Sequence, residues 1–199
     1  MKRLLPGYTW HKQPEGKTLF ITFDDGPVPV VTPFVLEQLK AYNARATFFC
    51  VGDNLSKHPE IAEQLLREGH VLANHTFNHL KGWQTSTSDY LQNIRACEAE
   101  LSKFQVLKRL FRPPYGRITG KQAAKLRQEG YELIMWDVLT NDYDNSLAPE
   151  ECLQKSIKFT ENGSIVVFHD SVKAQRNLMY VLPRYLEHFA KQGYTFEAL

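Results

Sequence analysis

The segment KTLFITFDDGP, residues 17–27, joins an apolar run to two adjacent carboxylates and a turn. A short apolar run that stops at Asp-Asp-Gly-Pro predicts a buried strand over Lys17–Phe23, followed by a loop. Asp24 and Asp25 begin that loop. Neighbouring carboxylates repel one another unless a cation or a proton intervenes, but Asp-Gly and Gly-Pro are also common turn signals. The pair alone therefore leaves both a simple turn and a functional site open.

The same alternation of apolar runs and helical periodicity continues along the chain. Further strands are predicted at Ala46–Val51, His70–Ala73, Leu110-Phe111, Tyr131–Asp137, Ser164–Phe168 and Tyr194–Phe196. Helices are predicted at residues 31–42, Pro59–Glu68, residues 86–104 (with a capping box from Ser86 and Asp89), Gly120–Glu129, Pro149–Thr160 and Arg176–Lys191. Near-continuous apolar strands between helices imply a parallel sheet covered on both faces.

About seven such units predict an α/β fold, namely a distorted or incomplete (β/α)7–8 TIM-like barrel in a single domain. A doubly wound open sheet is the competing architecture. We assign residues 17–199 to this domain and residues 1–16 to an N-terminal extension. The predicted strands also have polar residues after their carboxyl ends, which share one face in a barrel, the face where active sites lie. These residues are Asp24, Asp25, His75, Arg112, Asp142 and His169.

Composition limits the classes of partner. The chain has 199 residues, of which 43% are hydrophobic, enough for one domain with a full core. A net charge of +2 is too weak to indicate a nucleic-acid partner. Cys50, Cys97 and Cys152 are widely spaced and include no C-x-x-C, so we expect neither a disulfide framework nor a cysteine zinc site. Cys50 is predicted to be a buried strand residue.

The N-terminus is basic but has only two leucines before Pro6, whereas a signal peptide needs an apolar stretch of about 7 to 15 residues. No segment approaches the ~20 apolar residues of a membrane span. We therefore expect a soluble chain, either cytoplasmic as it stands or the trimmed domain of an exported or cell-envelope protein. The sequence leaves the oligomeric state open.

His75 and His79 are four residues apart, a spacing that predicts both imidazoles on one side of a helical turn. Such a pair can hold one metal ion, although two solvent-facing or capping histidines would share the spacing. One aspartate with two histidines makes a three-ligand site with open positions, as a catalytic zinc requires. Asn74 is expected to help fix the turn.

These residues give the chain a family resemblance that extends from about Lys17 to Phe196. The chain resembles the polysaccharide deacetylases of the NodB-homology type, carbohydrate esterase family 4. The matching stretches are Thr22–Pro27, His75–His79 (H-[ST]-x-x-H), Arg112–Gly116 (R-x-P-Y) and Phe168-His169 (L-x-H with Phe for Leu). Four ordered motifs at the family's spacing are highly specific.

The resemblance implies a role for each matching residue. The ligands of zinc, or of another divalent ion such as cobalt, would be Asp25, His75 and His79. Asp24 would be the general base that activates water, and Arg112 would pair with it and keep it ionised. The backbone N–H of Tyr115 would help bind the oxyanion. His169 would protonate the leaving amine.

The fourth motif of the family, D-x-x-D-W, corresponds to Leu139–Tyr143. Asp142 matches the second aspartate, which orients the histidine acid. Leu139 and Tyr143 depart from the pattern. Tyr143 keeps an aromatic wall, but its effect on substrate fit is open. Arg45 is a weaker candidate for a partner of Asp142.

The implied function is metal-dependent hydrolysis of N-acetyl groups from poly- or oligosaccharides that contain N-acetylglucosamine, with release of acetate. Candidate substrates are peptidoglycan, chitin fragments and a related exopolysaccharide. One alternative is an O-acetyl esterase acting on a polysaccharide such as xylan, since it needs the same site. Another is a non-catalytic carbohydrate-binding relative, whose mark would be a lost base, acid or ligand. Trp83 and Tyr143 are candidates for stacking on sugar rings, and packing is an equal alternative for Trp83.

Overall fold

The computed structural model describes residues 7–106 and 108–199, which form one parallel sheet wrapped by helices. The strands are β1 (Tyr8–Thr9), β2 (Thr18–Asp24), β3 (Thr47–Cys50), β4 (Val71–Asn74), β5 (Leu110–Phe111), β6 (Glu132–Ile134), β7 (Val138–Leu139), β8 (Ile165–His169) and β9 (Thr195–Glu197). The α-helices are α1 (Val31–Ala41), α2 (Gly52–Lys57), α3 (Pro59–Arg67), α4 (Thr87–Ser102), α5 (Gly120–Gln128), α6 (Pro149–Phe159) and α7 (Gln175–Ala190). Two short 3₁₀ helices, η1 (Gly82–Gln84) and η2 (Pro114–Gly116), follow β4 and β5.

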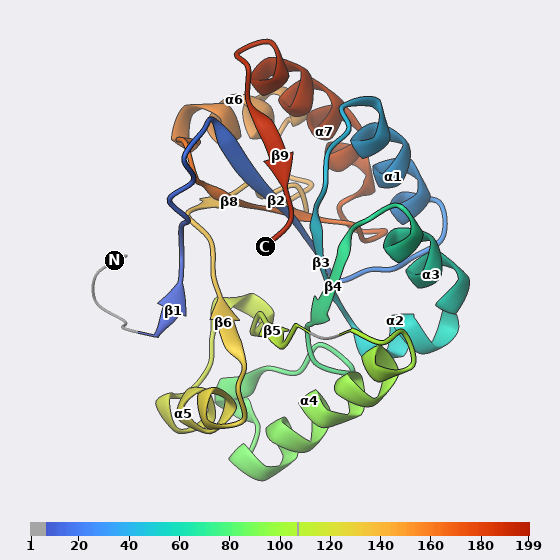
Figure 1. Cartoon of the computed structure of the whole chain (residues 1–199), viewed down its shortest axis with the longest axis vertical. Coiled ribbons are helices and arrows are strands. Elements are labelled where there is room, and N and C mark those ends of the chain that lie inside the picture. Colours follow the sequence, from blue (N-terminus) through green and yellow to red (C-terminus); the bar gives the residue numbers. More distant parts are fainter. Residues whose placement is uncertain (1–6, 107) are drawn as a thin grey trace.

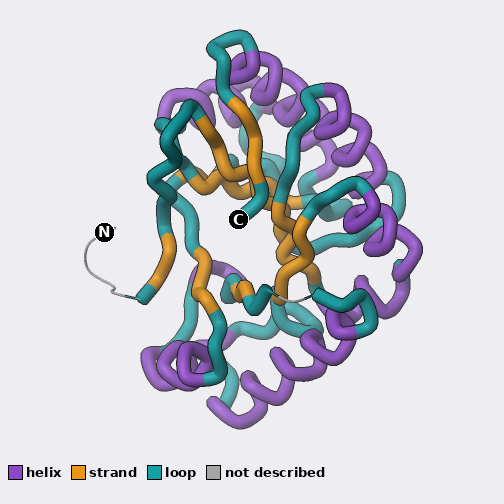
Figure 2. The backbone as a smooth tube through the Cα atoms, viewed as in Figure 1, coloured by secondary structure: helices purple, strands orange, loops and turns teal. Residues whose placement is uncertain are grey.

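The strand order is β1-β6-β5-β4-β3-β2-β8-β7, and β9 pairs with β2. Strand β2 lies between β3 and β8, so the first and last repeating units are neighbours, and the order does not reverse in mid-sheet as in a doubly wound fold. The sheet is curled, and the helices form an arc around its outer side (Figures 1 and 2). The prediction of an incomplete TIM-like barrel is confirmed, and the doubly wound alternative is wrong.

The strand predicted over Tyr131–Asp137 is shorter than expected. Residues 132–134 form β6, which pairs with β5 and β1, and the chain then crosses to β7, which begins beyond the predicted range and pairs with β8. Asp137 lies at the crossing, where its carboxylate accepts hydrogen bonds from Ile165 N (2.9 Å) and Ser164 Oγ (3.1 Å) and its backbone N–H donates to Ile165 O (3.3 Å). A side chain therefore supplies part of the pairing there, which apolar periodicity does not reveal.

Besides β7 and the two 3₁₀ helices, two further elements were not predicted from the sequence. Strand β1 lies within residues 1–16 and pairs with β6 through Tyr8 and Leu133, so part of this segment extends the same sheet. Helix α2 begins where the backbone N–H of Gly52 and of Asp53 donate to carbonyls of the loop that follows β4, at 3.0 and 2.8 Å. Both elements depend on partners distant in sequence.

The alternation of side chains in β2 places one carboxylate inside the barrel. The outward residues Leu19, Ile21 and Phe23 belong to the core beneath the helices. Phe20 packs against the inner cluster Phe49, Ala73, Leu110, Ile134 and Ile165, which comes from five other strands. Because side chains two and four positions away share a face, Asp24 lies above Phe20 on the inner side.

Helix ends and the outer surface follow ordinary rules. Ser86 caps α4 by accepting from Asp89 N at 3.2 Å, but the Asp89 carboxylate bonds to Ser86 Oγ (2.7 Å), so only half of the predicted capping box forms.

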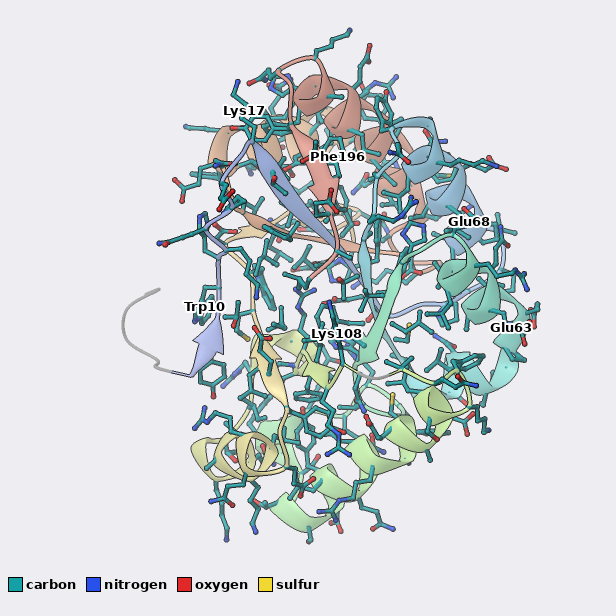
Figure 3. The ribbon with its side chains drawn as sticks, viewed as in Figure 1. Trp10, Lys17, Glu63, Glu68, Lys108 and Phe196 are labelled. Carbon is teal, nitrogen blue, oxygen red and sulfur yellow. The ribbon has the colours of Figure 1, made fainter. Side chains whose placement is uncertain are left out.

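The three cysteines are free and buried. Glu63 and Glu68 lie on the outer side of the helix layer, away from the sheet (Figure 3). Among the described residues, no helix is both long and apolar enough to cross a membrane.

The core between the sheet and the helices gives a testable prediction about stability. Phe23 is fully buried and stacks with Phe48 and Phe168 at 4.9 and 5.8 Å between ring centroids. Phe23→Ala should lower the free energy of unfolding by about 3–5 kcal/mol. Phe159→Ala is the control, because this ring is 65% exposed and its loss should change stability by less than about 0.5 kcal/mol. Equal shifts in urea denaturation would contradict the assigned core.

Candidate active site

A cavity of about 400 Å³ opens at the carboxyl ends of the strands. It is lined by Asp24, Asp25, His75, His79, Tyr115, Trp136, Leu139, Tyr143, Val167, His169 and Lys173. The structure thus brings together six of the eight predicted site residues as lining groups. The other two, Arg112 and Asp142, are fully buried, and each contacts a lining residue.

Arg112 holds Asp24 in place. Its Nη1 donates to Asp24 Oδ1 at 2.6 Å and to Thr22 Oγ1 at 2.8 Å, while its Nη2 donates to Met135 O at 3.1 Å. The guanidinium also lies over the Phe49 ring, 4.0 Å from the centroid. These contacts fix both the position and the charge partner of the Asp24 carboxylate.

The pKa of Asp24 is lowered from its ordinary value. Burial alone would raise it, but the positive charge of Arg112 and the nearby imidazoles of His75 and His169 outweigh burial. Asp24 is therefore ionised at neutral pH and can accept a proton.

Three side chains next to Asp24 form a candidate metal centre. Asp25, His75 and His79 each offer one ligand atom, and these atoms all lie within 4.8 Å of one another. Asp25 Oδ1 is 3.3 Å from His79 Nε2 and 3.9 Å from His75 Nε2. Ligand atoms about 2.0–2.1 Å from a tetrahedral zinc would be about 3.3 Å apart, so the set needs little adjustment.

His75 is prepared as a ligand. Its Nδ1–H donates to Arg112 O at 2.7 Å, which directs Nε2 toward the other ligand atoms. Burial lowers its pKa to about 4, against the opposing charge of Asp24, so the imidazole is neutral at physiological pH. A neutral imidazole with its second nitrogen hydrogen-bonded is the form that binds metal.

The histidine pair does not lie on a helical turn, so that part of the prediction is wrong. Residues 75–79 form a loop in which Thr76 (φ 67°) and His79 (φ 57°) are left-handed. Asn74 stabilises the loop as predicted, since its Oδ1 accepts from Thr76 N (2.9 Å) and its Nδ2 donates to Ile94 O (2.9 Å). The two imidazoles converge because of the loop conformation.

Left-handed backbone is concentrated in the site loops. Among the described residues, eight non-glycine residues have positive φ, and five of them lie in these loops: Asp25, Thr76, His79, Tyr115 and Asn141. Such conformations cost of order 1–3 kcal/mol each and persist only where surrounding contacts hold them. The neighbouring elements therefore stabilise the geometry of the site.

His169 and Asp142 form the second ion pair of the site. His169 Nδ1–H donates to Asp142 Oδ1 at 2.7 Å, and the backbone N–H of His169 donates to Asp142 Oδ2 at 2.8 Å. Burial alone would lower the pKa of His169, but Asp142, with Asp25 and Asp24, raises it to about 9. A divalent ion bound to Asp25 would offset part of this effect, whereas the contribution of Asp142 would remain.

Aromatic rings and cations flank these groups. Tyr143 lies 4.9 Å from His169 between ring centroids, and Lys173 Nζ is 5.3 Å from the Tyr143 centroid. On the opposite side, Tyr115 is 53% exposed and contacts the rings of His79 (4.6 Å) and Trp83 (5.5 Å). Trp83 packs edge-on against Tyr115 and is not part of the cavity lining.

Sequence reasoning missed Trp136 and Lys173 and misplaced Arg45. Trp136 lies within a stretch predicted as strand, and Lys173 lies four residues after the end of β8, where no motif marked it. The position of Arg45 just before β3 puts it at the opposite end of that strand from the site, where it bonds to Ala44 O (3.4 Å). Its predicted contact with Asp142 is therefore wrong.

Comparisons with known proteins show to which family this chain belongs. The sequence profile of the polysaccharide deacetylase family matches residues 11–134. A peptidoglycan-N-acetylglucosamine deacetylase of Bacillus cereus is 34% identical over 98% of this chain and 93% of its own length. A chitooligosaccharide deacetylase of Azorhizobium caulinodans is 30% identical over 82% of this chain and 78% of its own.

The fold agrees as closely. The crystal structure of the Bc1960 peptidoglycan N-acetylglucosamine deacetylase superposes with a TM-score of 0.90 at 26% identity, covering 97% of this chain and 91% of that one. The chain therefore belongs to the polysaccharide deacetylase family. With 97% of this chain covered, the structural match extends beyond residue 134, where the profile match ends.

The second ion pair predicts a change in pH dependence. Because the charge of Asp142 raises the pKa of His169, Asp142→Asn should lower that pKa, and the protonated imidazole should be lost at a lower pH. Chemical shifts of the His169 ring, followed by NMR titration, give the pKa directly. In the activity profile the alkaline limb should move to lower pH while the acid limb stays. An unmoved alkaline limb would contradict this assignment of the pair.

Proposed function

We propose that this protein is a metal-dependent deacetylase that hydrolyses N-acetyl groups of glucosamine units in a polysaccharide, releasing acetate. The observation that supports it most is the placement of an ionised carboxylate, a three-residue ligand set and a protonated histidine in one cavity. Amide hydrolysis needs these functions: a base for water, an electrophile for the carbonyl oxygen and an acid for the amine.

The residues that are present fit a divalent metal ion. Asp25, His75 and His79 supply one oxygen and two nitrogens, a set typical of catalytic zinc sites, which leave open positions. A divalent ion held there would polarise the acetyl carbonyl and lower the pKa of water. Cobalt binds the same donor atoms, so we propose zinc, or alternatively cobalt, as the metal ion in the cell.

The protein's own residues transfer the protons. Asp24 accepts a proton from the attacking water as the C–O bond forms, and Arg112 keeps the carboxylate ionised and aimed. His169 donates its Nε2 proton to the sugar nitrogen as the C–N bond breaks, so the nitrogen leaves as a neutral amine. The backbone N–H of Tyr115 is the proposed donor to the oxyanion. Solvent returns Asp24 and His169 to their starting states.

Two alternative functions would require different features of the site. An O-acetyl esterase needs the same base and ligands, but an alkoxide leaves more easily than an amide nitrogen and depends less on an acid. The strong Asp142–His169 pair therefore favours the amide substrate. A non-catalytic carbohydrate-binding relative would have lost a base, acid or ligand, whereas all of them are present in this chain.

The rim of the cavity favours peptidoglycan among the candidate glycans. Lys173 lines the cavity, and its Nζ lies 5.3 Å from the centroid of the Tyr143 ring. Next to the cavity lining, Lys81 Nζ lies 5.8 Å from the centroid of the Tyr115 ring, and Arg117 lies 4.4 Å from that of Trp83. Peptidoglycan strands carry carboxylates on the peptides or free lactyl groups of alternate sugars, and chitin fragments carry none. Cations in and next to the cavity would attract the acidic glycan.

Acetate release tests the function. The purified protein should release acetate from N-acetylglucosamine oligomers or from peptidoglycan fragments, should lose this activity after chelation and should regain it with zinc or cobalt. Full turnover by protein shown to be metal-free would overturn the mechanism.

Substitution of the first aspartate separates base from ligand. Asp24→Asn should keep bound zinc while losing roughly 10²-fold or more in kcat, as removal of a general base does. Metal content measured by atomic emission is the second readout. A variant that cannot hold zinc would identify Asp24 as a ligand instead.

The position of Lys173 predicts a preference for negatively charged substrates. Lys173→Gln should lower kcat/KM about threefold to tenfold on peptidoglycan fragments, more at low salt than at high salt, and little on neutral N-acetylglucosamine oligomers. Lys40→Gln, an exposed lysine on α1, is the control. Equal losses on acidic and neutral substrates would exclude charge recognition by Lys173.

A further inference from the structure

Asp170 is a buried carboxylic acid with no role in the proposed chemistry. It directly follows His169, is 1% exposed and does not line the cavity. A buried carboxyl group is costly unless its oxygens are hydrogen-bonded. Its contacts all lead to the loop that carries Asp24 and Asp25.

The carboxyl group binds this loop directly at Gly26 and indirectly through Thr32 at the start of α1. Asp170 Oδ1 accepts from the backbone N–H of Gly26 at 3.0 Å, and Oδ2 accepts from Thr32 Oγ1 at 2.7 Å. Thr32 Oγ1 in turn accepts from the backbone N–H of Val28 at 2.8 Å. The backbone N–H of Asp170 also donates to Asp24 O at 3.1 Å. The end of β8 is therefore connected to the loop both before and after the ligand Asp25.

The fit between Asp170 and the loop is close. A Cβ atom on Gly26 would lie 1.9 Å from Asp170 Oδ2, so a side chain at this position would displace the carboxylate. The φ of Gly26 is not positive, and this close approach is thus the reason for glycine there. Asp25 itself is left-handed (φ 86°), a conformation that needs support from outside the loop.

On the other side, Asn54 Nδ2 donates to Asp25 O at 2.8 Å, and Val51 N donates to Gly26 O at 3.0 Å. These bonds hold the loop against β3 and α2. The bonds from Asp170 hold it against β8, whose last residue is the proposed acid His169. Asp170 thereby sets the distance between the metal-ligand loop and the strand that carries the acid.

We propose that Asp170 is a positioning residue that clamps the Asp24–Val28 loop and so holds Asp25 in its metal-binding conformation. The proposal rests on the assigned metal site. Asp170 touches neither substrate nor metal, so its effect should appear in metal affinity and in the ligand field, beyond any loss of stability. Partners that orient a ligand typically contribute about 10- to 100-fold to metal affinity.

The first test measures zinc affinity by competition with a chromophoric chelator on folded, metal-free protein. Asp170→Ala should weaken zinc binding about 10- to 100-fold, and Thr32→Val should weaken it by a smaller factor. Thr32→Ser keeps the hydroxyl and should restore native affinity. The cobalt-loaded variants Asp170→Ala and Thr32→Val should also show altered visible absorption bands.

Leu186→Ala is the control for lost stability. Leu186 is fully buried near the end of α7, from which the chain passes to β9 beside the first residues of β2, at the end of the sheet away from the metal ligands. This variant should be destabilised yet bind zinc as tightly as the native protein. Native zinc affinity and cobalt spectrum in both Asp170→Ala and Thr32→Val would overturn the proposal. Failure of the native protein to bind zinc would overturn the metal site, and the clamp with it.

A double-mutant cycle tests the contact itself and remains informative if Asp170→Ala folds poorly. Gly26→Ala should weaken zinc binding strongly in the native background, because the added methyl group meets the carboxylate. In the Asp170→Ala background the same change should cost much less, because the obstructing oxygens are gone. Strictly additive losses in zinc affinity would show that Gly26 and Asp170 act independently and would overturn the clamp.

Discussion

The buried ion pair between Arg112 and Asp24 is the interaction on which the rest of the site depends. Both partners are almost wholly removed from water, so loss of either would leave an uncompensated charge, a change that typically costs about 3–5 kcal/mol. Arg112 also accepts from His75 Nδ1 through its carbonyl and donates its backbone N–H to Asn74 O. One residue thus fixes the base, one metal ligand and the strand that leads to both histidines.

The two ion pairs of the site have opposite effects on protonation. Arg112 keeps a carboxylate ionised, and Asp142 keeps an imidazole protonated, although burial opposes the charged form of each. Titratable groups whose environments push their pKa values apart are the mark of an acid and a base in one site. Asp24, His169 and the three candidate metal ligands all line the same cavity.

The loops of the site are strained, and the strain is balanced by contacts from the barrel. Asp25, His79 and Tyr115 all have left-handed backbones. Asp25 accepts a hydrogen bond from Asn54 of α2, and the rings of His79 and Tyr115, which follow different strands, contact one another. In a curled parallel sheet the carboxyl ends of successive strands meet on one face. The fold therefore supplies several independent supports within a few ångströms, as the contacts of Asp170 with the first loop illustrate.

The amino-acid sequence by itself determined the class of fold, the family and the identity of the chemical groups. Apolar runs that stop at Asp24, at His75 and at His169 encode strands and mark their ends, because strand length and turn residues are local properties. Tertiary structure alone decided how these groups meet. The loop conformation that turns His79 toward Asp25, the early end of the predicted strand at Ile134 and the approach of Lys173 to Tyr143 all depend on partners far away in sequence. Spacing along the chain cannot specify such contacts, since they form only when the curled sheet brings the strand ends together.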